Sequence, residues 1–577
     1  MKKISHWFID KIKRKISSIL KKYEIEYDIK SYEIKRICSS IFLNQIFLSK
    51  KNILYESIKI EYVCCKLSVW KSLFNMALMG EIDLQDISCN MSVIADKLFY
   101  LKSIKITFRL RGKFKIACFD VGNISCFLQL TRKKRSKELI IDIPNFSWND
   151  IRLLFSGNFA SYFLQNLFSD DKLHLQACLE KTIHSDIPFV YANINYDALH
   201  FHNLQKHCEM NKDYLIRLLY EKLKDNQKIC ITYNDIPKDL VNAIICTEDP
   251  LFWSHEGISL DFISFALATN IKEKRIIRGA STITMQLIRN LFLSHDRNFL
   301  RKIEESTLAL LLENYYKIDK QVILEMYINI IEFAPNIYGL YDAAFFYFEK
   351  EYTNLTLIEI ITLTYIIPRP KHFYDALITQ SFQLKTNLYN HIKNYSYILF
   401  RGNFISVDRF MNIGLDIHFA ERFGSLNLNQ FALKDQQDRE QTNQNNLKNV
   451  HPNLVTIIRE AAQNCPVPFI IIEGVRTAEK QKKIYAQGRT LPGAIVTYCD
   501  GVKEKSNHQL KDDGYGYAVD LYPYISGKIL ITESNVPEIL QIIAKHIKET
   551  AQKINISITW GGDWKIRDYP HFELRLL

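Results

Sequence analysis

Two clusters of residues in the 577-residue chain have the types and spacing that catalysis requires. The first combines two glutamates, Glu248 and Glu305, with two cations, Arg301 and Lys302, just before the second glutamate. A carboxylate can act as a general base towards a hydroxyl group. Cations can stabilise the negative charge that develops on a leaving group. Lys302 and Glu305 are three residues apart, so on a helix they would share one face.

The second cluster lies near the C-terminus and contains His508, Asp520, Asp568 and His571. Histidine and carboxylate side chains are common zinc ligands, and a catalytic zinc usually has three protein ligands and one open position. Zinc lowers the pKa of a bound water to about 7, which supplies a nucleophile for amide hydrolysis at neutral pH. Side chains of these types have the chemistry that a metal-dependent hydrolytic site requires.

The first cluster belongs to four motifs that follow one another in the chain. They read EDPLFWSHEG (248–257), RGASTITMQLIRNLFL (278–293), RKIEESTLALLLE (301–313) and ILEMYINIIEF (323–333). In this order they resemble the peptidoglycan transglycosylases of glycosyltransferase family 51, over the stretch from Tyr233 to Asp375. The resemblance implies polymerisation of glycan from a disaccharide linked to a polyprenyl pyrophosphate.

By this resemblance Glu248 is the general base that deprotonates the 4-hydroxyl of the acceptor sugar. Glu305 is the second catalytic carboxylate, placed near the leaving group or near a Mg²⁺ or Mn²⁺ ion that accompanies it. The donor sugar and its pyrophosphate would be bound by a set of polar and cationic residues: Ser281, Thr282, Gln286, Arg289, Arg301 and Lys302.

Three positions depart from the usual family pattern. Ala280 stands where a second glycine is frequent, Met285 where a glutamine is frequent, and Arg289 where lysine is usual. Arginine keeps the charge but changes the donor geometry. Paired carboxylates also cleave glycans in lysozyme-like hydrolases, but an uncharged leaving sugar would not need the surrounding cations. Since both glutamates are kept, we expect an active transferase.

Three further motifs surround the second cluster: GVRTAEKQKKIYAQG (474–488), SNHQLKDDGYGYAVDLYPY (506–524) and WGGDWKIRDYPHFEL (560–574). They resemble the zinc D-Ala-D-Ala carboxypeptidases and, through the last motif, the L-alanyl-D-glutamate endopeptidases of phage endolysins. The resemblance implies that His508, Asp520 and His571 bind zinc. It also implies that Asp568 is the general base that takes a proton from the attacking water.

The same resemblance gives Arg476 a role in steadying a substrate carboxylate or an oxyanion, and it gives Gln481 a role in holding the substrate. His508 and Asp520 are twelve residues apart where seven is common, and KDDGY (511–515) reads as an inserted loop that leaves both ligands in place. A cysteine-based site at Cys465 or Cys499 is a weaker alternative, because neither cysteine has a histidine partner in a matching motif.

The elements around these clusters indicate a multidomain α+β protein. We expect a basic amphipathic helix (1–30), a β-rich domain (31–225), a mainly α-helical, lysozyme-like transglycosylase domain (226–423), a polar linker (424–450) and a small α+β zinc peptidase domain (451–577). Apolar and polar residues alternate at the start of Ser103–Phe119, with similar runs at Ser57–Trp70 and Glu138–Ile143, which is typical of strands. Helical periodicity marks Ser306–Tyr315 and Lys320–Ile331.

The net charge of +12 favours anionic partners. Nucleic acid is not expected, since no recognised nucleic-acid-binding module is present. An anionic membrane surface is expected, because residues 1–24 combine eight Lys or Arg residues with apolar residues at helical spacing. The apolar stretch Ile258–Asn270 could also touch lipid or form a plain core helix. No transmembrane run or secretory signal is evident. The twelve cysteines are expected to be buried thiols.

Together these features predict an enzyme of peptidoglycan metabolism with two activities. It would polymerise lipid-linked disaccharide-peptide and cut stem peptides, peripherally bound at the outer face of the cytoplasmic membrane in a bacterial envelope. Two alternatives remain open. One is a hydrolase whose middle domain only binds lipid-linked substrate, and the other is a non-enzymatic envelope scaffold.

Overall fold

The computed structural model describes residues 25–575 apart from several gaps, the longest of which are 51–56, 68–77, 91–98, 156–161, 202–212 and 222–229. The chain divides into two compact units. Unit 1 combines Met1–Asn234 with Asp249–Ile331, and unit 2 combines Asp235–Glu248 with Glu332–Leu577. Residues 1–24 of the expected basic helix lie outside the described residues, and residues 25–30 belong to the first strand.

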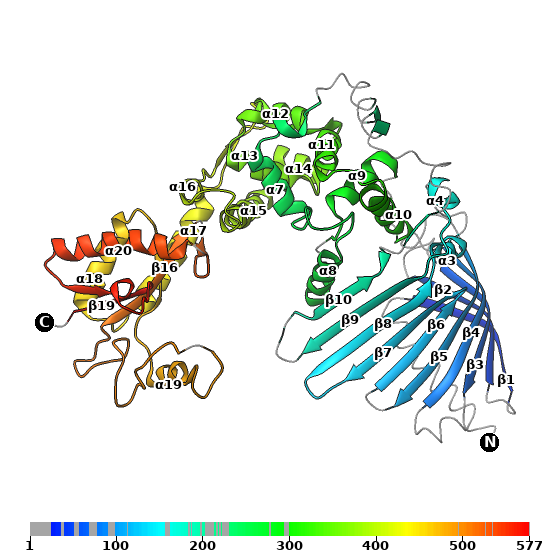
Figure 1. Ribbon diagram of the computed structural model, residues 1–577, viewed down its shortest axis with the longest axis horizontal. Coiled ribbons are helices and arrows are strands. Elements are labelled where there is room, and N and C mark those ends of the chain that lie inside the picture. Colours follow the sequence, from blue (N-terminus) through cyan, green and yellow to red (C-terminus); the bar gives the residue numbers. More distant parts are fainter. Residues whose placement is uncertain are drawn as a thin grey trace. The chain divides into compact units, whose positions relative to one another are not determined.

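The N-terminal part of unit 1 is a ten-stranded antiparallel sheet in which the strands follow their order in the sequence. The strands are β1 (Ile25–Lys35), β2 (Ser40–Lys50), β3 (Ser57–Leu67), β4 (Leu78–Asn90), β5 (Phe99–Arg111), β6 (Phe114–Val121), β7 (Ile124–Arg132), β8 (Ser136–Phe146), β9 (Leu173–Thr182) and β10 (Phe189–Ile194). Figure 1 shows this sheet as a strongly twisted meander. Two short helices, α3 (Trp148–Leu154) and α4 (Tyr162–Asn166), lie between β8 and β9 in sequence. The β-rich character is confirmed, and the predicted strands correspond to β3, β5, β6 and β8. Residues 68–70 of the predicted run Ser57–Trp70 lie outside the described residues.

One face of this sheet is apolar because the alternation in neighbouring strands is in register. Val63, Leu84, Ile104 and Val121 are cross-strand partners from β3 to β6. Directly paired residues project from the same face of a sheet. The sequence neighbours of these residues, such as Lys105 next to Ile104, therefore project from the other face of the sheet. Val63 is only 4% exposed. This register explains why the strand pattern could be recognised in the sequence.

The rest of unit 1 is helical and carries the second and third transglycosylase-like motifs, all of the first except Glu248, and the fourth as far as Ile331. Its helices are α8 (Leu260–Glu273), α9 (Ile283–Phe292), α10 (Phe299–Leu310), the π-helical turn Leu311–Tyr315 and α11 (Lys320–Ile330). Helix α9 packs against α10 and α11, and α8 packs against β10. The helices expected at Ser306–Tyr315 and Lys320–Ile331 are confirmed. No helix in the described part of the chain is both long and apolar enough to cross a membrane.

Gly257 joins the first motif to helix α10. Its φ of +89° lies in the region that favours glycine. A Cβ atom at this position would lie 2.5 Å from the carbonyl oxygen of Ala309. Only a residue without a side chain lets the two backbones approach this closely.

The substitution Gly257→Ala is therefore expected to destabilise unit 1 by about 3 kcal/mol, from backbone strain and overpacking together. Urea unfolding of the full chain would measure the change. Gly279→Ala is the matched control, because its Cβ would meet no atom within 4 Å. Equal unfolding midpoints for the two variants would contradict the expected steric cost.

Unit 2 begins with α7 (Lys238–Glu248), which packs against α13 (Leu357–Ile366) and α15 (Phe382–Arg401). The elements that follow are β11 (Glu332–Ala334), β12 (Ile337–Tyr338), α12 (Leu340–Phe348), α13 (Leu357–Ile366), α14 (Pro370–Ile378), α15 (Phe382–Arg401), α16 (Val407–Met411), β13 (Asp416–His418) and β14 (Ser425–Asn427). Apolar residues of α7, including Leu240 and Ile244, are buried against this bundle. The packing fixes the last turn of α7, where Glu248 lies.

The polar segment 424–450 contains helix α17 (Asn429–Asn446), which has no buried residue. This helix packs against β15 (Phe469–Glu473). The backbone N–H of Ile471 donates to Asn443 Oδ1 at 2.7 Å, and Asn446 Nδ2 donates to the Ile471 carbonyl at 2.7 Å. The expected linker is thus a helix held by side-chain amides, which hydrophobic periodicity does not reveal.

The C-terminal part of unit 2 is a small α+β module. Its main sheet has the order β15, β16 (Ala518–Ile525), β19 (His571–Leu574), β18 (Ile558–Trp560), and β17 (Lys528–Ile529) pairs with β16. Helices α18 (Pro452–Asn464) and α20 (Val536–Lys553) pack against each other and against the sheet. The short helix α19 (Ala478–Ala486) follows β15 in the chain. Strands β16 and β19 are neighbours, which brings two distant motifs together.

Candidate active sites

In unit 1, helix α10 carries a buried cluster of one carboxylate and two cations. Glu305 has no exposed surface, and it accepts hydrogen bonds from Arg301 Nη1 and, at 2.5 Å, from Lys302 Nζ. Lys302 Nζ also donates to Ser281 Oγ at 2.7 Å. Burial lowers the pKa of Lys302, and the Glu305 carboxylate opposes that shift. The expectation that Lys302 and Glu305 share one helical face is confirmed.

The second motif lies beside this cluster, but its residues have different environments. Thr282 is fully buried at the start of α9, where its hydroxyl donates to the carbonyl of Gly257 at 2.6 Å and accepts from the Met285 backbone. Gln286 accepts from the hydroxyl of Tyr327 at 3.1 Å. Met285 is buried, 4% exposed. Met285, which departs from the family pattern, is therefore a buried core residue of helix α9.

Arg289 lies in the last turn of α9, and its positive charge is one of the causes that lower the pKa of Lys302, after burial and the charge of Arg301. Ser281, Arg289, Arg301 and Lys302 thus bring one hydroxyl and three cations to the surroundings of Glu305. Such a group can stabilise an anionic phosphate.

A buried polar network, which the sequence reading missed, connects the first and second motifs. Asp249 is fully buried and accepts from His255 Nε2 at 2.9 Å and from the backbone of Ile283 at 3.0 Å. Lys320 lies 3.3 Å from His255 Nδ1 and forms an ion pair with Glu313 at 2.5 Å. The network fixes the start of α9 relative to the residues after Glu248. The Glu-Asp dipeptide and His255 were its only signal in the sequence.

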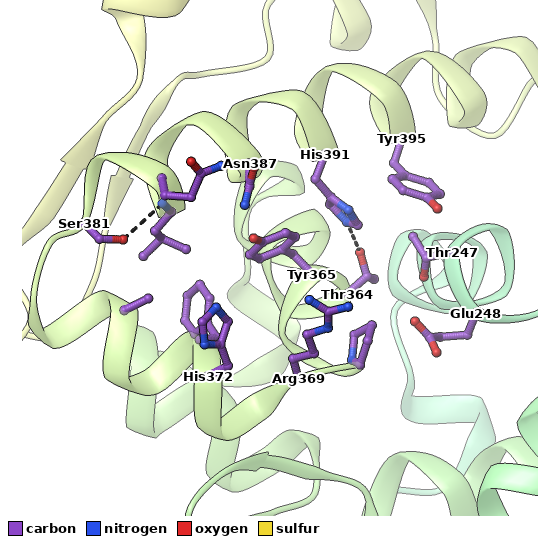
Figure 2. Close-up of a pocket in the computed structure, with 15 residues that line it drawn as sticks. Thr247, Glu248, Thr364, Tyr365, Arg369, His372, Ser381, Asn387, His391 and Tyr395 are labelled. Carbon is purple, nitrogen blue, oxygen red and sulfur yellow. Dashed lines mark hydrogen bonds between the residues drawn. The ribbon is translucent and has the colours of Figure 1, made fainter. Parts of the chain in front are cut away.

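In unit 2, Glu248 is the last residue of α7 and lines a pocket of about 450 Å³ (Figure 2). Figure 2 shows Glu248, at the end of α7, and Arg369, just before the start of α14, projecting into this pocket. The polar lining residues are Thr247, Glu248, Thr364, Tyr365, Arg369, His372, Ser381, Gln383, Asn387, His391 and Tyr395. A pocket with many hydrogen-bonding groups and several aromatic rings suits a sugar. Glu305 belongs to unit 1 and Glu248 to unit 2.

His391 lines this pocket, and its Nε2 lies 3.0 Å from the hydroxyl of Thr364. Burial lowers its pKa to about 3. An unfolded histidine has a pKa near 6.5, so acid protonates the unfolded chain first. The contribution of neutral His391 to stability is complete above about pH 6.5 and is lost as the pH falls towards 3.

Acidification from pH 7 to pH 5 is accordingly expected to cost unit 2 about 2 kcal/mol through His391 alone. The measurement is the free energy of unfolding against pH for the wild type and for His391→Gln. The variant should be less stable at pH 7 but show a flatter slope between pH 7 and pH 5. Parallel curves would show that His391 does not cause the slope.

The C-terminal module brings together three side chains that could hold a metal ion. His508 Nε2, Asp520 Oδ1 and His571 Nδ1 form a triangle with sides of 3.1, 3.1 and 3.2 Å. Zinc bonds of 2.0–2.1 Å in a tetrahedron require ligand atoms about 3.3 Å apart. Among the described residues this is the one group of three or more such side chains found to fit a metal. The three predicted ligands are therefore close enough to bind one ion.

Strand pairing explains how residues distant in sequence meet at this triangle. Asp520 on β16 is the cross-strand partner of His571 on β19. The inserted residues 511–515 form a closed turn, in which the backbone of Lys511 donates to Tyr515 at 2.9 Å and Gly514 donates to Lys511 at 3.0 Å. The extra residues between His508 and Asp520 thus leave the triangle intact, as expected.

Arg476 has several partners at the edge of the triangle. It donates to both oxygens of Glu473 at 2.9 and 2.8 Å, to Gln481 Oε1 at 2.9 Å and to Asp520 Oδ2 at 3.4 Å. Gln481 has no exposed surface, and its amide also donates to the carbonyl of Cys499 at 2.8 Å. In this structure Arg476 and Gln481 both form hydrogen bonds with other protein groups around the site.

Electrostatics at the triangle follow from burial and close contacts. Burial would raise the pKa of Asp520, but hydrogen bonds and charge from the two histidines outweigh it and hold the pKa well below its usual range. Burial would lower the pKa of His571, yet hydrogen bonds to Asp520 and Glu573 raise it to about 9. Partial burial and then the charge of Asp520 raise the pKa of Asp568. A base with a raised pKa is better suited to accept a proton.

Gly561 explains part of the Trp-Gly-Gly-Asp-Trp motif. A Cβ atom there would lie 2.3 Å from the Asp568 carbonyl oxygen and 3.1 Å from His571 Cβ. The backbone of Asp568 donates to the Gly561 carbonyl at 2.9 Å. The glycine therefore allows the turn that carries Asp568 to pack beside His571.

The cysteines that the structure describes are free thiols. Cys64 is buried, as expected for a small apolar side chain. The expectation of burial was wrong for the others, which are only partly buried: Cys65, Cys118, Cys126, Cys178, Cys230, Cys246, Cys465 and Cys499. Burial raises the pKa of Cys465, which disfavours the reactive thiolate that a cysteine-based site would need.

Comparisons with known proteins match two families to two successive parts of the chain. The family model described as Transglycosylase matches residues 216–391, and the model described as Phage L-alanyl-D-glutamate peptidase matches residues 438–574. A biosynthetic peptidoglycan transglycosylase of Janthinobacterium sp. (strain Marseille) is 41% identical over 146 residues, which are 25% of this chain and 62% of that protein. One from Cupriavidus metallidurans is 36% identical over 166 residues, which are 28% of this chain and 70% of that protein.

The crystal structure of the L-Ala D-Glu endopeptidase ChiX of Serratia marcescens is 30% identical in sequence, with 23% of this chain and 86% of that chain covered and a TM-score of 0.19. The chain spans less than two thirds of the length of the Janthinobacterium relative. Since it covers more than two thirds of the Cupriavidus enzyme, the chain belongs to the peptidoglycan transglycosylase family, and a domain that matches the phage L-alanyl-D-glutamate peptidases follows in the same polypeptide.

Proposed function

We propose that this protein polymerises peptidoglycan strands from lipid-linked disaccharide-peptide and cuts stem peptides with a zinc-dependent site. The triangle of His508, Asp520 and His571 donor atoms is the observation that carries the peptidase part, because its sides match a zinc tetrahedron. The matching family model gives the bond to test first, which is the one between L-alanine and D-glutamate. We also propose the domain boundaries 226–423 and 451–577 and a lysozyme-like fold for the middle domain, whereas residues 424–450 contain helix α17 in place of the expected linker.

In the polymerising domain, Glu248 is the general base towards the 4-hydroxyl of the acceptor sugar, which is bound in the adjoining pocket. Ser281, Arg289, Arg301 and Lys302 bind the pyrophosphate of the donor, with Glu305 holding Arg301 and Lys302 in place. Thr282 and Gln286 complete the donor site mainly by fixing helix α9. A Mg²⁺ or Mn²⁺ ion would assist the departing pyrophosphate.

In the peptidase domain, His508, Asp520 and His571 would hold zinc, and zinc when bound supplies Lewis acidity that activates a water molecule. Asp568 accepts a proton from the attacking water and delivers it to the leaving amine. Arg476 and Gln481 orient the substrate indirectly, by positioning Asp520 and the segment around Cys499.

The protein acts peripherally at the outer face of the cytoplasmic membrane. Helix α8 exposes Phe265, Leu267 and Ile271, which are 51%, 46% and 37% accessible, and these side chains could enter a lipid surface. The net charge of +12 would favour anionic lipids.

Two assays of the full chain test the proposal. Incubation with lipid-linked disaccharide-pentapeptide should give glycan polymer, detected after gel separation. Incubation of peptidoglycan with the zinc-loaded protein should give fragments whose masses show cleavage after L-alanine. Polymer formation with no new fragments would contradict the peptidase assignment, and fragments without polymer would reduce the middle domain to a binding platform.

A further inference from the structure

The imidazole ring of His571 has a partner on each of its two nitrogens. Nδ1 lies 3.1 Å from both His508 Nε2 and Asp520 Oδ1, at the candidate metal position. Nε2, on the opposite side of the ring, lies 3.1 Å from Glu573 Oε2. A histidine that binds a metal through Nδ1 must be neutral, so its proton is on Nε2. That proton can only be donated away from the metal, towards Glu573.

The Glu573 carboxylate is itself held in place. Asn507 Nδ2 donates to Glu573 Oε2 at 2.8 Å. The backbone of Tyr517 donates to the carbonyl of Asn507 at 2.7 Å, which ties this asparagine to the residues leading into β16. Glu573 lies two residues after His571 on β19, so both side chains project from the same face of the strand. The acceptor is therefore fixed by a strand and by a hydrogen bond.

The other histidine of the triangle is oriented differently. His508 Nδ1 donates to the backbone carbonyl of Gly474 at 2.8 Å. A backbone partner cannot be removed by substitution, whereas the partner of His571 is a side chain. Asp520 has a charged partner of its own, Arg476 Nη2, at 3.4 Å.

We propose that Glu573 is a positioning residue of the metal centre, which fixes the tautomer and the ring orientation of His571 so that Nδ1 faces the metal. This rests on the proposed zinc site. Carboxylates that accept from metal-binding histidines raise the basicity of the ligand and align its ring. Without Glu573 the ring could rotate about its Cβ–Cγ bond, and the proton would be free to move to Nδ1.

The test measures zinc affinity of the full chain by competition with a chromophoric chelator. Glu573→Ala should weaken zinc binding roughly 10–100-fold, the usual effect of removing such a partner. Glu573→Gln should stay within a few-fold of the wild type, because its amide oxygen can still accept from Nε2–H. Glu549→Ala, an exposed glutamate on α20, should bind zinc as the wild type does.

Thermal unfolding of the metal-free proteins separates positioning from folding. Equal unfolding temperatures for metal-free Glu573→Ala and wild type, with weaker zinc binding, would support the proposal. Wild-type affinity in Glu573→Ala would overturn it, as would an equal loss in Glu573→Gln. If Glu573→Ala fails to fold, Asn507→Ala decides, since freeing the carboxylate should weaken zinc binding several-fold; unchanged affinity there also overturns it. A wild type that binds no zinc would contradict the metal centre itself.

Discussion

Replacing His571 by alanine is expected to abolish stem-peptide cleavage while polymerisation continues. The side chain is 7% exposed and supplies one corner of the triangle, the one group of side chains in the described part of the chain found to fit a metal. Loss of a Lewis acid worth several kcal/mol in the transition state corresponds to a fall in rate on the order of 10³-fold or more. Mass analysis of peptidoglycan fragments would show the fall in cleavage rate, and the zinc content of the same protein sample would be measured alongside.

The matched control is His546→Ala on α20, which removes a histidine of the same module outside the triangle. It should cut and bind zinc like the wild type. Cleavage at the wild-type rate by the His571 variant would mean that the hydrolytic site is elsewhere.

A second large effect is expected for Glu248→Gln, which should stop glycan polymerisation and leave peptide cleavage intact. The change keeps the size of the side chain but removes its ability to take a proton. General-base catalysis is typically worth 10²–10⁴-fold, so the polymerisation rate should fall by about that factor. The rate is measured from labelled lipid-linked precursor.

Glu421→Gln serves as its control, because Glu421 is exposed in the same unit and does not line the pocket. Unchanged polymerisation by the Glu248 variant would remove this residue from the mechanism and direct attention to the carboxylate of Glu305.

Local patterns in the sequence predicted local structure well. Alternation at Ser103–Phe119 predicted β5, because one face of the sheet is apolar across several strands. Helix α17 could not be predicted in this way, since its contacts with β15 are made by Asn443 and Asn446 through hydrogen bonds. A periodicity of apolar residues cannot report such contacts.

The same difference between local patterns and contacts made by the folded chain applies to the candidate sites. The motifs gave the three metal-binding side chains, but their meeting depends on the pairing of Asp520 with His571, and strand pairing depends on the whole module. Supporting residues of the two sites, such as Glu573 and Asp249, were missed because the sequence does not show that Asn507 and the backbone of Ile283 lie within hydrogen-bonding distance of them. Their roles can be inferred only from hydrogen-bond distances in the structure.

The two asparagines of α17 have a consequence for how the peptidase module can be handled. Strand β15 is at the edge of its sheet. Without α17, the backbone N–H and C=O of Ile471 would be unpaired and could bind a strand of another molecule. Asn443 and Asn446 occupy those groups as a neighbouring strand would, which protects the edge from intermolecular pairing. A fragment starting at residue 451 would lack this cover and should self-associate, whereas one that starts before Asn429 should remain monomeric.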